Sequence, residues 1–152
     1  MEEGPRKTGM SLERGRKVSH YELLEPVGEG GMGAVWKARD TVLGREVALK
    51  VLSETWASDP SRLALFEREA RALAALNHPN IITIYSVEAA DSLRFITMEL
   101  IRGRTLAEIL VGERLPLARL LDIAAAVCEA VSSAHAQAIT HRDLKSGNIM
   151  VG

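Results

Sequence analysis

The chain has 152 residues, of which 47% are hydrophobic and 26% are charged, and its formal net charge is −1 at pH 7. These proportions are typical of a soluble globular domain with one hydrophobic core, or of part of a larger domain. The balanced charge and an aromatic content of 4% argue against nucleic acid and against an anionic membrane as binding partners.

Residues 1–19 are rich in charge and glycine and show no hydrophobic period, so we expect them to form a flexible tail. This region also lacks the apolar segment of a signal peptide. No stretch of the sequence approaches the roughly 20 apolar residues that a membrane-spanning helix requires. We therefore expect a cytoplasmic protein with no membrane segment in this chain.

Five segments after residue 20 have the composition and length of β-strands. The first three are joined by short turns, which is typical of an antiparallel sheet. The last two are separated by EAADS and are expected to form a hairpin of largely buried strands. The five segments are residues 21–27, 34–40, 45–52, 81–87 and 93–100.

One helix is expected between the third and fourth strands. Asp59 suits the N-cap, Pro60 suits the first helical position, and apolar residues follow at helical spacing as far as Leu76. A short helix at residues 105–110 and a long helix at residues 117–137 follow the last strand. The chain is therefore predicted to have an α+β fold, with a sheet-rich first part and a helical second part.

The long helix contains the single cysteine of the chain, Cys128. One cysteine excludes a disulfide framework within the chain, which suits a reducing compartment. Its apolar surroundings predict a small, buried helix residue.

The turn GEGGMG, residues 28–33, has the glycine spacing of several phosphate-binding loops. A dinucleotide-binding turn would lead into a helix, but AVWKA after this turn has the alternation of a strand. The spelling also excludes a Walker-type loop, because there is no GxxxxGK[ST]. Two interpretations remain, a simple tight hairpin and a flap whose bare backbone N–H groups close over phosphates, with Val35 above the attached base.

Lys50 and Glu69 are expected to form an ion pair. The period of two in REVALKVL puts Lys50 and Ala48 on one face of a strand. Glu69 falls at the edge of the apolar stripe of the next helix, where a carboxylate is costly unless it is paired. Such a pair would hold the lysine extended toward phosphate oxygens. Glu67, in contrast, is expected to form a surface pair with Arg71, one helical turn further on.

Together with HRDLKSGN at residues 141–148, these motifs resemble a protein kinase domain of the eukaryotic type, most closely the bacterial serine/threonine kinases. Residues 27–35 match the glycine-rich loop, and VALK, which ends in Lys50, matches the third strand of the family. Glu69 matches the glutamate of the helix called αC, and MEL at residues 98–100 matches the hinge. The resemblance implies a two-lobed fold with ATP in the cleft.

In this scheme residues 20–152 are an incomplete kinase domain. The N-lobe, a five-stranded antiparallel sheet with helix αC, would span about residues 20–100. The first helices and catalytic loop of the C-lobe would span about residues 103–152, with a hinge near residues 101–103.

The resemblance also implies which residues contact ATP. Val35 and Ala48 would lie above the adenine ring and Met150 below it, while the backbones of Glu99 and Ile101 would hydrogen-bond its edge. The full implied set is Val27, Gly28, Glu29, Gly30, Gly31, Met32, Gly33, Ala34, Val35, Ala48, Lys50, Met98, Glu99, Ile101 and Met150.

Phosphate transfer would depend on the catalytic loop as well as on Lys50 and Glu69. By resemblance, Asp143 accepts the proton of the substrate hydroxyl, Lys145 steadies the transferred phosphate, and Asn148 is a Mg²⁺ ligand. A lysine two residues after the aspartate is typical of kinases that act on serine and threonine. The implied cofactors are ATP and Mg²⁺, and the implied partner is a protein substrate with serine or threonine hydroxyls.

The family continues beyond Asn148 with a DFG triplet, an activation segment and further helices, and none of these is in the chain. We therefore expect little phosphate transfer from residues 1–152 alone. We also expect self-association, because one apolar side of the helix at residues 117–134 would lack its cover. The alternative is a natural truncated kinase-like module that binds nucleotide or a partner without catalysis.

Overall fold

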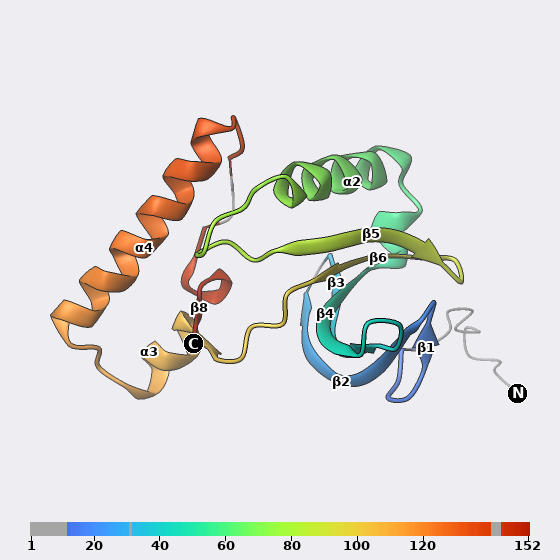
Figure 1. Cartoon of the computed structure of the whole chain (residues 1–152), viewed down its shortest axis with the longest axis horizontal. Helices are drawn as coiled ribbons and strands as arrows, with labels where there is room; N and C mark the ends of the chain where they lie inside the picture. The colour runs from blue at the N-terminus through green and yellow to red at the C-terminus, as the bar shows by residue number, and fades with distance from the viewer. Residues whose placement is uncertain (1–11, 31, 141–143) are drawn as a thin grey trace, which may run out of the picture.

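The computed structural model describes residues 12–30, 32–140 and 144–152. Its largest element is a curled antiparallel sheet, which carries the first part of the chain (Figure 1). The strands run in the order β1-β2-β3-β4-β6-β5. Their bounds are β1 (Lys17–Val18), β2 (Tyr21–Gly30), β3 (Gly33–Asp40), β4 (Arg45–Leu52), β5 (Ile84–Ala90) and β6 (Leu93–Met98).

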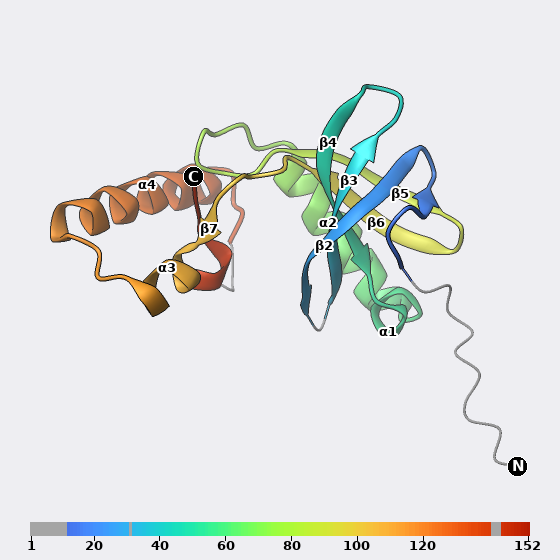
Figure 2. The same cartoon turned by 90° about the horizontal axis from the view of Figure 1, so that it is seen from below.

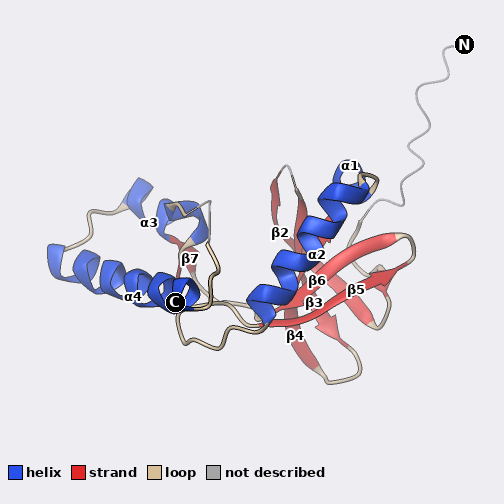
Figure 3. Cartoon of the chain, turned by 90° about the horizontal axis from the view of Figure 1, so that it is seen from above, coloured by secondary structure: helices blue, strands red, loops and turns tan. Residues whose placement is uncertain are grey.

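The helices fall into two groups, one packed on the sheet and one beyond the linker, residues 99–103, that follows β6 (Figure 3). The first group is α1 (Glu54–Ala57) and α2 (Pro60–Ala74). The second is α3 (Leu106–Gly112), α4 (Leu117–Ala136) and the 3₁₀ turn η1 (Ser146–Asn148). Two short strands, β7 (Arg104–Thr105) and β8 (Met150–Val151), pair antiparallel beside α3 and η1. The α+β prediction is thus confirmed, and five strands are found in the predicted order, although the fourth, expected at residues 81–87, lies at Ile84–Ala90 and takes in part of the predicted turn.

The period of two along β4 assigns its residues to two different hydrophobic clusters. Val47, Leu49 and Val51 are buried on one face, in a cluster closed by Phe95 and residues from β1 to β3. The opposite face is covered by α2. There the helix packs through its buried residues, Phe66 and Ala70, against Leu52 and Ile96 of the sheet.

Helix α2 begins where the sequence predicts. The Asp59 carboxylate accepts hydrogen bonds from the backbone N–H groups of Ser61 at 3.0 Å and Arg62 at 3.3 Å, and Pro60 is the first helical residue. The side chain of Asp59 therefore satisfies two donors that the first turn of the helix leaves without partners.

The predicted tail of residues 1–19 is too long at its C-terminal end. Val18 is fully buried, and it pairs with Tyr21 in the antiparallel β1–β2 contact. Residues 17 and 18 therefore form a sixth strand at the edge of the sheet, which their charged flanks concealed.

Cys128 is exposed rather than buried, contrary to its prediction. Among the residues of α4, Ala130 is buried. The physical reason is that α4 stands apart from the sheet and has little packed against it (Figure 2). One polar contact joins it to the loop after α2, where Asn80 Nδ2 donates to the Ala126 carbonyl at 3.4 Å.

None of the helices in the described ranges combines the length and the apolar character needed to cross a membrane.

Candidate active site

The strand register brings the predicted nucleotide-binding side chains together on the face of the sheet that α2 partly covers. Val35 of β3 is opposite Lys50 of β4, which is opposite Ile96 of β6. In the adjacent row, Ala48 is opposite Met98. Because directly opposite residues share a face of the sheet, Val35, Ala48, Lys50 and Met98 form one continuous surface, as the alternation along each strand predicts.

The glycine-rich turn is a hairpin between β2 and β3, in which Gly30 pairs with Gly33. Gly33 has φ of +152°, and a Cβ atom built on it would overlap the Val51 carbonyl oxygen. At Gly28 and Gly30 a Cβ atom would meet nothing within 4 Å. Glycine is thus required at Gly33 by the fold, whereas at Gly28 and Gly30 it leaves the backbone open to a ligand. Gly31 lies outside the described residues.

Lys50 is the most perturbed basic group of this surface. Burial lowers the pKa of its ammonium group from the ordinary value of 10.5, and no other cause contributes to that shift. A cation in such a place is stabilised by an anion close to its Nζ. The triphosphate of a nucleotide would supply that charge.

The predicted Lys50–Glu69 ion pair is not formed in this structure. Among the ion pairs of the described residues, none includes either side chain. The reason is the rotation of α2 about its axis, which turns Phe66 and Ala70 toward the sheet and leaves Glu69 exposed. The predicted surface pair of Glu67 with Arg71 is present, at 3.9 Å.

The linker between the lobes follows β6 and passes over the end of this surface. Glu99 is anchored to Thr83: its N–H donates to the Thr83 carbonyl at 2.8 Å, and its Oε2 accepts from the Thr83 N–H at 3.3 Å. No backbone hydrogen bond between described residues uses the Glu99 carbonyl or the Ile101 N–H. The β7–β8 register sets Met150 opposite Thr105, so Met150 lies just beyond the end of the linker.

The catalytic loop is only partly described. Asp143 lies outside the described residues. Lys145 and Asn148 are exposed at the two ends of η1, where the Asn148 N–H donates to the Lys145 carbonyl at 2.9 Å. Within the described ranges there is no group of three or more His, Cys, Asp or Glu that could hold a metal ion. Asn148 supplies one neutral amide oxygen, so the described residues do not make a Mg²⁺ site by themselves.

Three charged residues near this surface were not singled out from the sequence. Lys37 and Glu46 lie on the same face as Val35 and Ala48, because they are two residues away along β3 and β4. Arg102, on the linker, contacts Glu46 at 3.1 Å. The period of two could have identified the first two residues, but the Arg102 contact spans 56 positions of sequence and required the tertiary structure.

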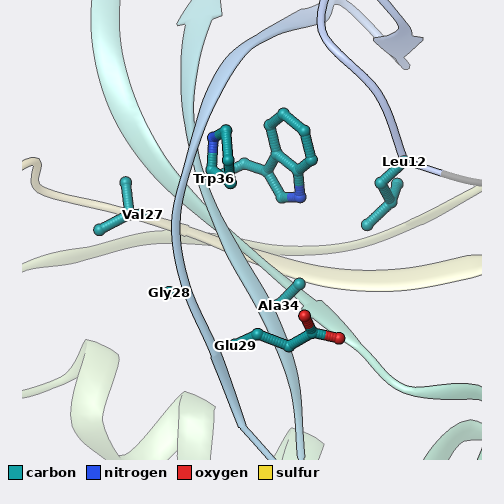
Figure 4. Close-up of a pocket in the computed structure, with 7 residues that line it drawn as sticks. Leu12, Val27, Gly28, Glu29, Ala34 and Trp36 are labelled. Carbon is teal, nitrogen blue, oxygen red and sulfur yellow. The ribbon is translucent and has the colours of Figure 1, made fainter.

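A cavity of about 550 Å³ opens on the other face of the glycine-rich hairpin (Figure 4). Trp36 and Ala34 border it, and both pack with the hydrophobic cluster on the side of the sheet away from α2. It is therefore separate from the surface that carries Lys50. The full lining is Leu12, Pro26, Val27, Gly28, Glu29, Ala34 and Trp36.

Comparison with known proteins extends this picture. The family described as protein kinase domain matches residues 21–152. The chain is 38% identical over 140 residues to the serine/threonine-protein kinase PrkC of Bacillus subtilis. The matched region covers 90% of this chain and 22% of that protein. It is 44% identical over 137 residues to the serine/threonine-protein kinase PknB of Mycolicibacterium smegmatis, and this match covers 86% of this chain and 22% of that protein.

Solved structures show the same fold. The kinase domain of PknI from Mycobacterium tuberculosis matches with a TM-score of 0.81 and 28% identity, over 92% of this chain and 57% of that one. The chain thus spans about a fifth of the length of the full-length relatives and more than half of a solved kinase domain. With the family match over residues 21–152 and the N-lobe surface described above, this chain belongs to the protein kinase domain family.

Proposed function

We propose that this chain carries the nucleotide-binding lobe and the catalytic loop of an ATP-dependent serine/threonine protein kinase. The observation that carries the proposal is the placement of Lys50. Its ammonium group is partly desolvated, and its side chain is directly opposite Val35 at the base of the glycine-rich hairpin. It has no carboxylate partner among the described residues. Such a site favours an anionic ligand beneath a flap of open backbone.

The nucleotide base would lie between the two lobes. Val35 and Ala48 would cover one side of the adenine ring and Met150 the other. The Glu99 carbonyl and the Ile101 N–H offer the acceptor and donor that an adenine edge needs, since no backbone bond among the described residues uses them. Met98 would border the back of this space.

The phosphates would lie under the hairpin of residues 27–35. Its remaining members, Val27, Glu29, Gly31, Met32 and Ala34, would contribute backbone or flanking contacts to this flap. Lys50 would contact the phosphate oxygens. Glu69 would pair with Lys50 once α2 turns toward the sheet.

The substrate would be a protein with a serine or threonine hydroxyl. We propose that Asp143 accepts the proton of that hydroxyl and that Lys145 neutralises charge on the transferred phosphate. Mg²⁺, when bound, would neutralise phosphate oxygens, and Asn148 is the proposed protein ligand. A cytoplasmic location would supply both ATP and protein substrates.

The test has two independent readouts. ATP with Mg²⁺ is titrated calorimetrically into the purified chain, and transfer of labelled phosphate to a generic protein substrate is measured separately. We expect Lys50→Met to weaken ATP binding by about tenfold or more, since it removes a charge-assisted contact. Asp143→Asn should leave ATP affinity within about twofold and should remove whatever phosphate transfer the chain supports.

Lys17→Met is the matched control, because Lys17 is an exposed lysine on a strand outside the candidate site. Absence of ATP binding, or equal binding by the wild type and the Lys50→Met variant, would contradict the proposal. ATP binding that depends on Lys50, with little or no phosphate transfer, agrees with the proposal and with a nucleotide-binding module alike, whereas transfer that Asp143→Asn abolishes would exclude the module.

We also propose that the chain associates with itself through exposed apolar residues on α3 and α4. Val111, Leu117 and Leu121 are all exposed, and they lie on consecutive helices of the second lobe.

A further inference from the structure

Four charged side chains form a row that crosses three strands of the sheet and ends on the linker between the lobes. Lys37 of β3 lies between two carboxylates, with its Nζ 3.6 Å from Glu25 Oε1 on β2 and 3.3 Å from Glu46 Oε1 on β4. The second oxygen of Glu46, Oε2, is 3.1 Å from Nη2 of Arg102. We refer to Glu25, Lys37, Glu46 and Arg102 as the charge row.

The charge row borders the proposed adenine site. Glu46 precedes Ala48 by two residues on β4, so the two side chains project from the same face. Lys37 is directly opposite Ala48 in the β3–β4 register. Arg102 follows Ile101 on the linker. The charge row therefore runs from beside Ala48, which would cover the adenine ring, to the linker residue that follows Ile101.

Glu46 connects the sheet to the linker because its two oxygens contact two different cations. An isolated exposed ion pair contributes little, since water and salt screen it. The side chains of Glu46 and Lys37 are each only 27% exposed, whereas Arg102 is 84% exposed. Lys37 thus keeps Glu46 ordered whether or not Arg102 is present. Loss of Arg102 would therefore remove one attachment of the linker and leave the contacts of Glu46 within the sheet in place.

The linker has a second attachment three residues before Arg102. Glu99 is held by two hydrogen bonds to Thr83, in the segment before β5. Glu99 is therefore anchored to the segment before β5, and Arg102 is anchored to β4. Two such anchors restrict the course of the backbone between them, which includes the N–H of Ile101.

We propose that Arg102 is a positioning residue for the nucleotide. Through Glu46 it sets the distance between the linker backbone, which would hydrogen-bond the adenine edge, and Ala48, which would cover the ring. This inference rests on the proposed function, since it requires the base to bind at the linker. Adenosine lacks phosphates, so its affinity reports on this part of the site alone.

The experiment is a double-mutant cycle on adenosine and ATP binding, measured by calorimetry at low salt. Arg102→Gln and Glu46→Gln should each weaken binding of both ligands by about two- to fivefold. The double variant should bind no more weakly than Glu46→Gln alone, because both changes remove the same contact. Arg102→Lys, which keeps the charge, should recover part of the loss. The matched control is Arg104→Gln, which breaks a 2.8 Å pair with Glu113 in the second lobe and should leave affinity unchanged.

Hydrogen exchange of the amides at residues 99–103, without nucleotide, gives a second readout. Exchange should be faster in Arg102→Gln and in Glu46→Gln than in the wild type. Unchanged affinity in Arg102→Gln, or fully additive losses in the double variant, would overturn the proposal even if exchange were faster. If the wild type bound neither ligand, the proposed function would fail, and exchange alone would decide whether Arg102 orders the linker.

Discussion

Lys50 shows how a single partly buried charge links stability to ligand binding. Burial lowers the pKa of its ammonium group below the ordinary value of 10.5. At neutral pH the folded chain therefore holds a cation that would be better solvated in the unfolded chain. The group destabilises the fold, and an anionic ligand beside it would remove that cost.

The Lys50→Met variant tests this linkage through pH. Between the lowered pKa of Lys50 and 10.5, the unfolded chain binds more protons at this group than the folded chain does, so the free energy of unfolding of the wild type rises with pH. We expect Lys50→Met to be more stable than the wild type at pH 7 and the difference to shrink as the pH approaches 10.5. Urea unfolding at several pH values measures this difference.

Methionine also changes packing, but that contribution does not depend on pH, so the pH dependence is the diagnostic result. Lys17→Met, at an exposed position, should show no such trend. A Lys50→Met variant whose stability relative to the wild type is constant from pH 7 to 10.5 would show that burial does not govern the pKa of Lys50.

Two glycines of the hairpin should respond differently to alanine. Gly33→Ala would place a methyl group against the Val51 carbonyl oxygen at a positive φ, so we expect the free energy of unfolding to fall by about 2–4 kcal/mol. Gly28→Ala meets open space and should change it by less than about 1 kcal/mol. Urea unfolding of both variants measures the contrast, and equal effects would mean that the hairpin adopts another conformation.

At the scale of elements, helix α2 links the sheet to the candidate site. Its N-terminus is fixed by Asp59, and its middle is fixed by Phe66 and Ala70 against the sheet. These contacts set the rotation that leaves Glu69 exposed. Pairing of Glu69 with Lys50 would require α2 to turn or shift against that packing.

Removal of the N-cap should destabilise this helix. We expect Asp59→Ala to lower the free energy of unfolding by about 1 kcal/mol, because two backbone N–H groups of the first turn lose their acceptor. Asp59→Asn keeps an oxygen acceptor at the same place and should retain most of the stability. Chemical denaturation measures both, and hydrogen exchange of the first turn of α2 localises the effect.

A different outcome would have a specific meaning. Asp59 also lies 3.5 Å from the Arg62 guanidinium. If Asp59→Asn were as destabilising as Asp59→Ala, the charge interaction with Arg62, rather than the cap, would hold the helix start.

On the scale of the whole molecule, the two lobes differ in how well their hydrophobic residues are covered. The sheet and α2 enclose two clusters of buried side chains. In the described part of the second lobe the buried hydrophobic residues are limited to Leu106, Ile109 and Ala130, while several large apolar residues are exposed. The exposed residues on these helices are Leu110, Val111, Leu117, Leu120 and Leu121, and Leu144, in the loop before η1, is exposed as well.

This difference predicts self-association through the second lobe. Light scattering at tens of micromolar should detect oligomers of the wild type, because burial of these side chains removes apolar surface from water. The double substitution Leu117→Lys with Leu121→Lys should shift the chain toward monomer. The control is Val42→Lys with Leu43→Lys, at the β3–β4 turn. Val42 is 71% exposed, which matches the 70% exposure of Leu117 on α4. A monomeric wild type, or equal effects of the two double variants, would contradict the prediction.

Local patterns in the sequence were sufficient for most elements and for the family. Alternation along residues 45–52 separates the buried face of β4 from the face that carries Lys50. Asp59 and Pro60 mark the start of α2 because capping depends on a few neighbouring residues. The spelling of the glycine-rich turn and of the catalytic loop identifies the family, because such motifs are contiguous in the chain.

Only the tertiary structure decided the contacts between elements. It leaves Glu69 away from Lys50, joins Arg102 to Glu46, and buries Val18 in an edge strand. A periodic pattern shows which side of a helix is apolar, but it does not specify the rotation of that helix against a sheet within a few tens of degrees. Contacts between long charged side chains depend on that rotation and on distances across the fold, and each contributes too little free energy to be imposed by the local sequence.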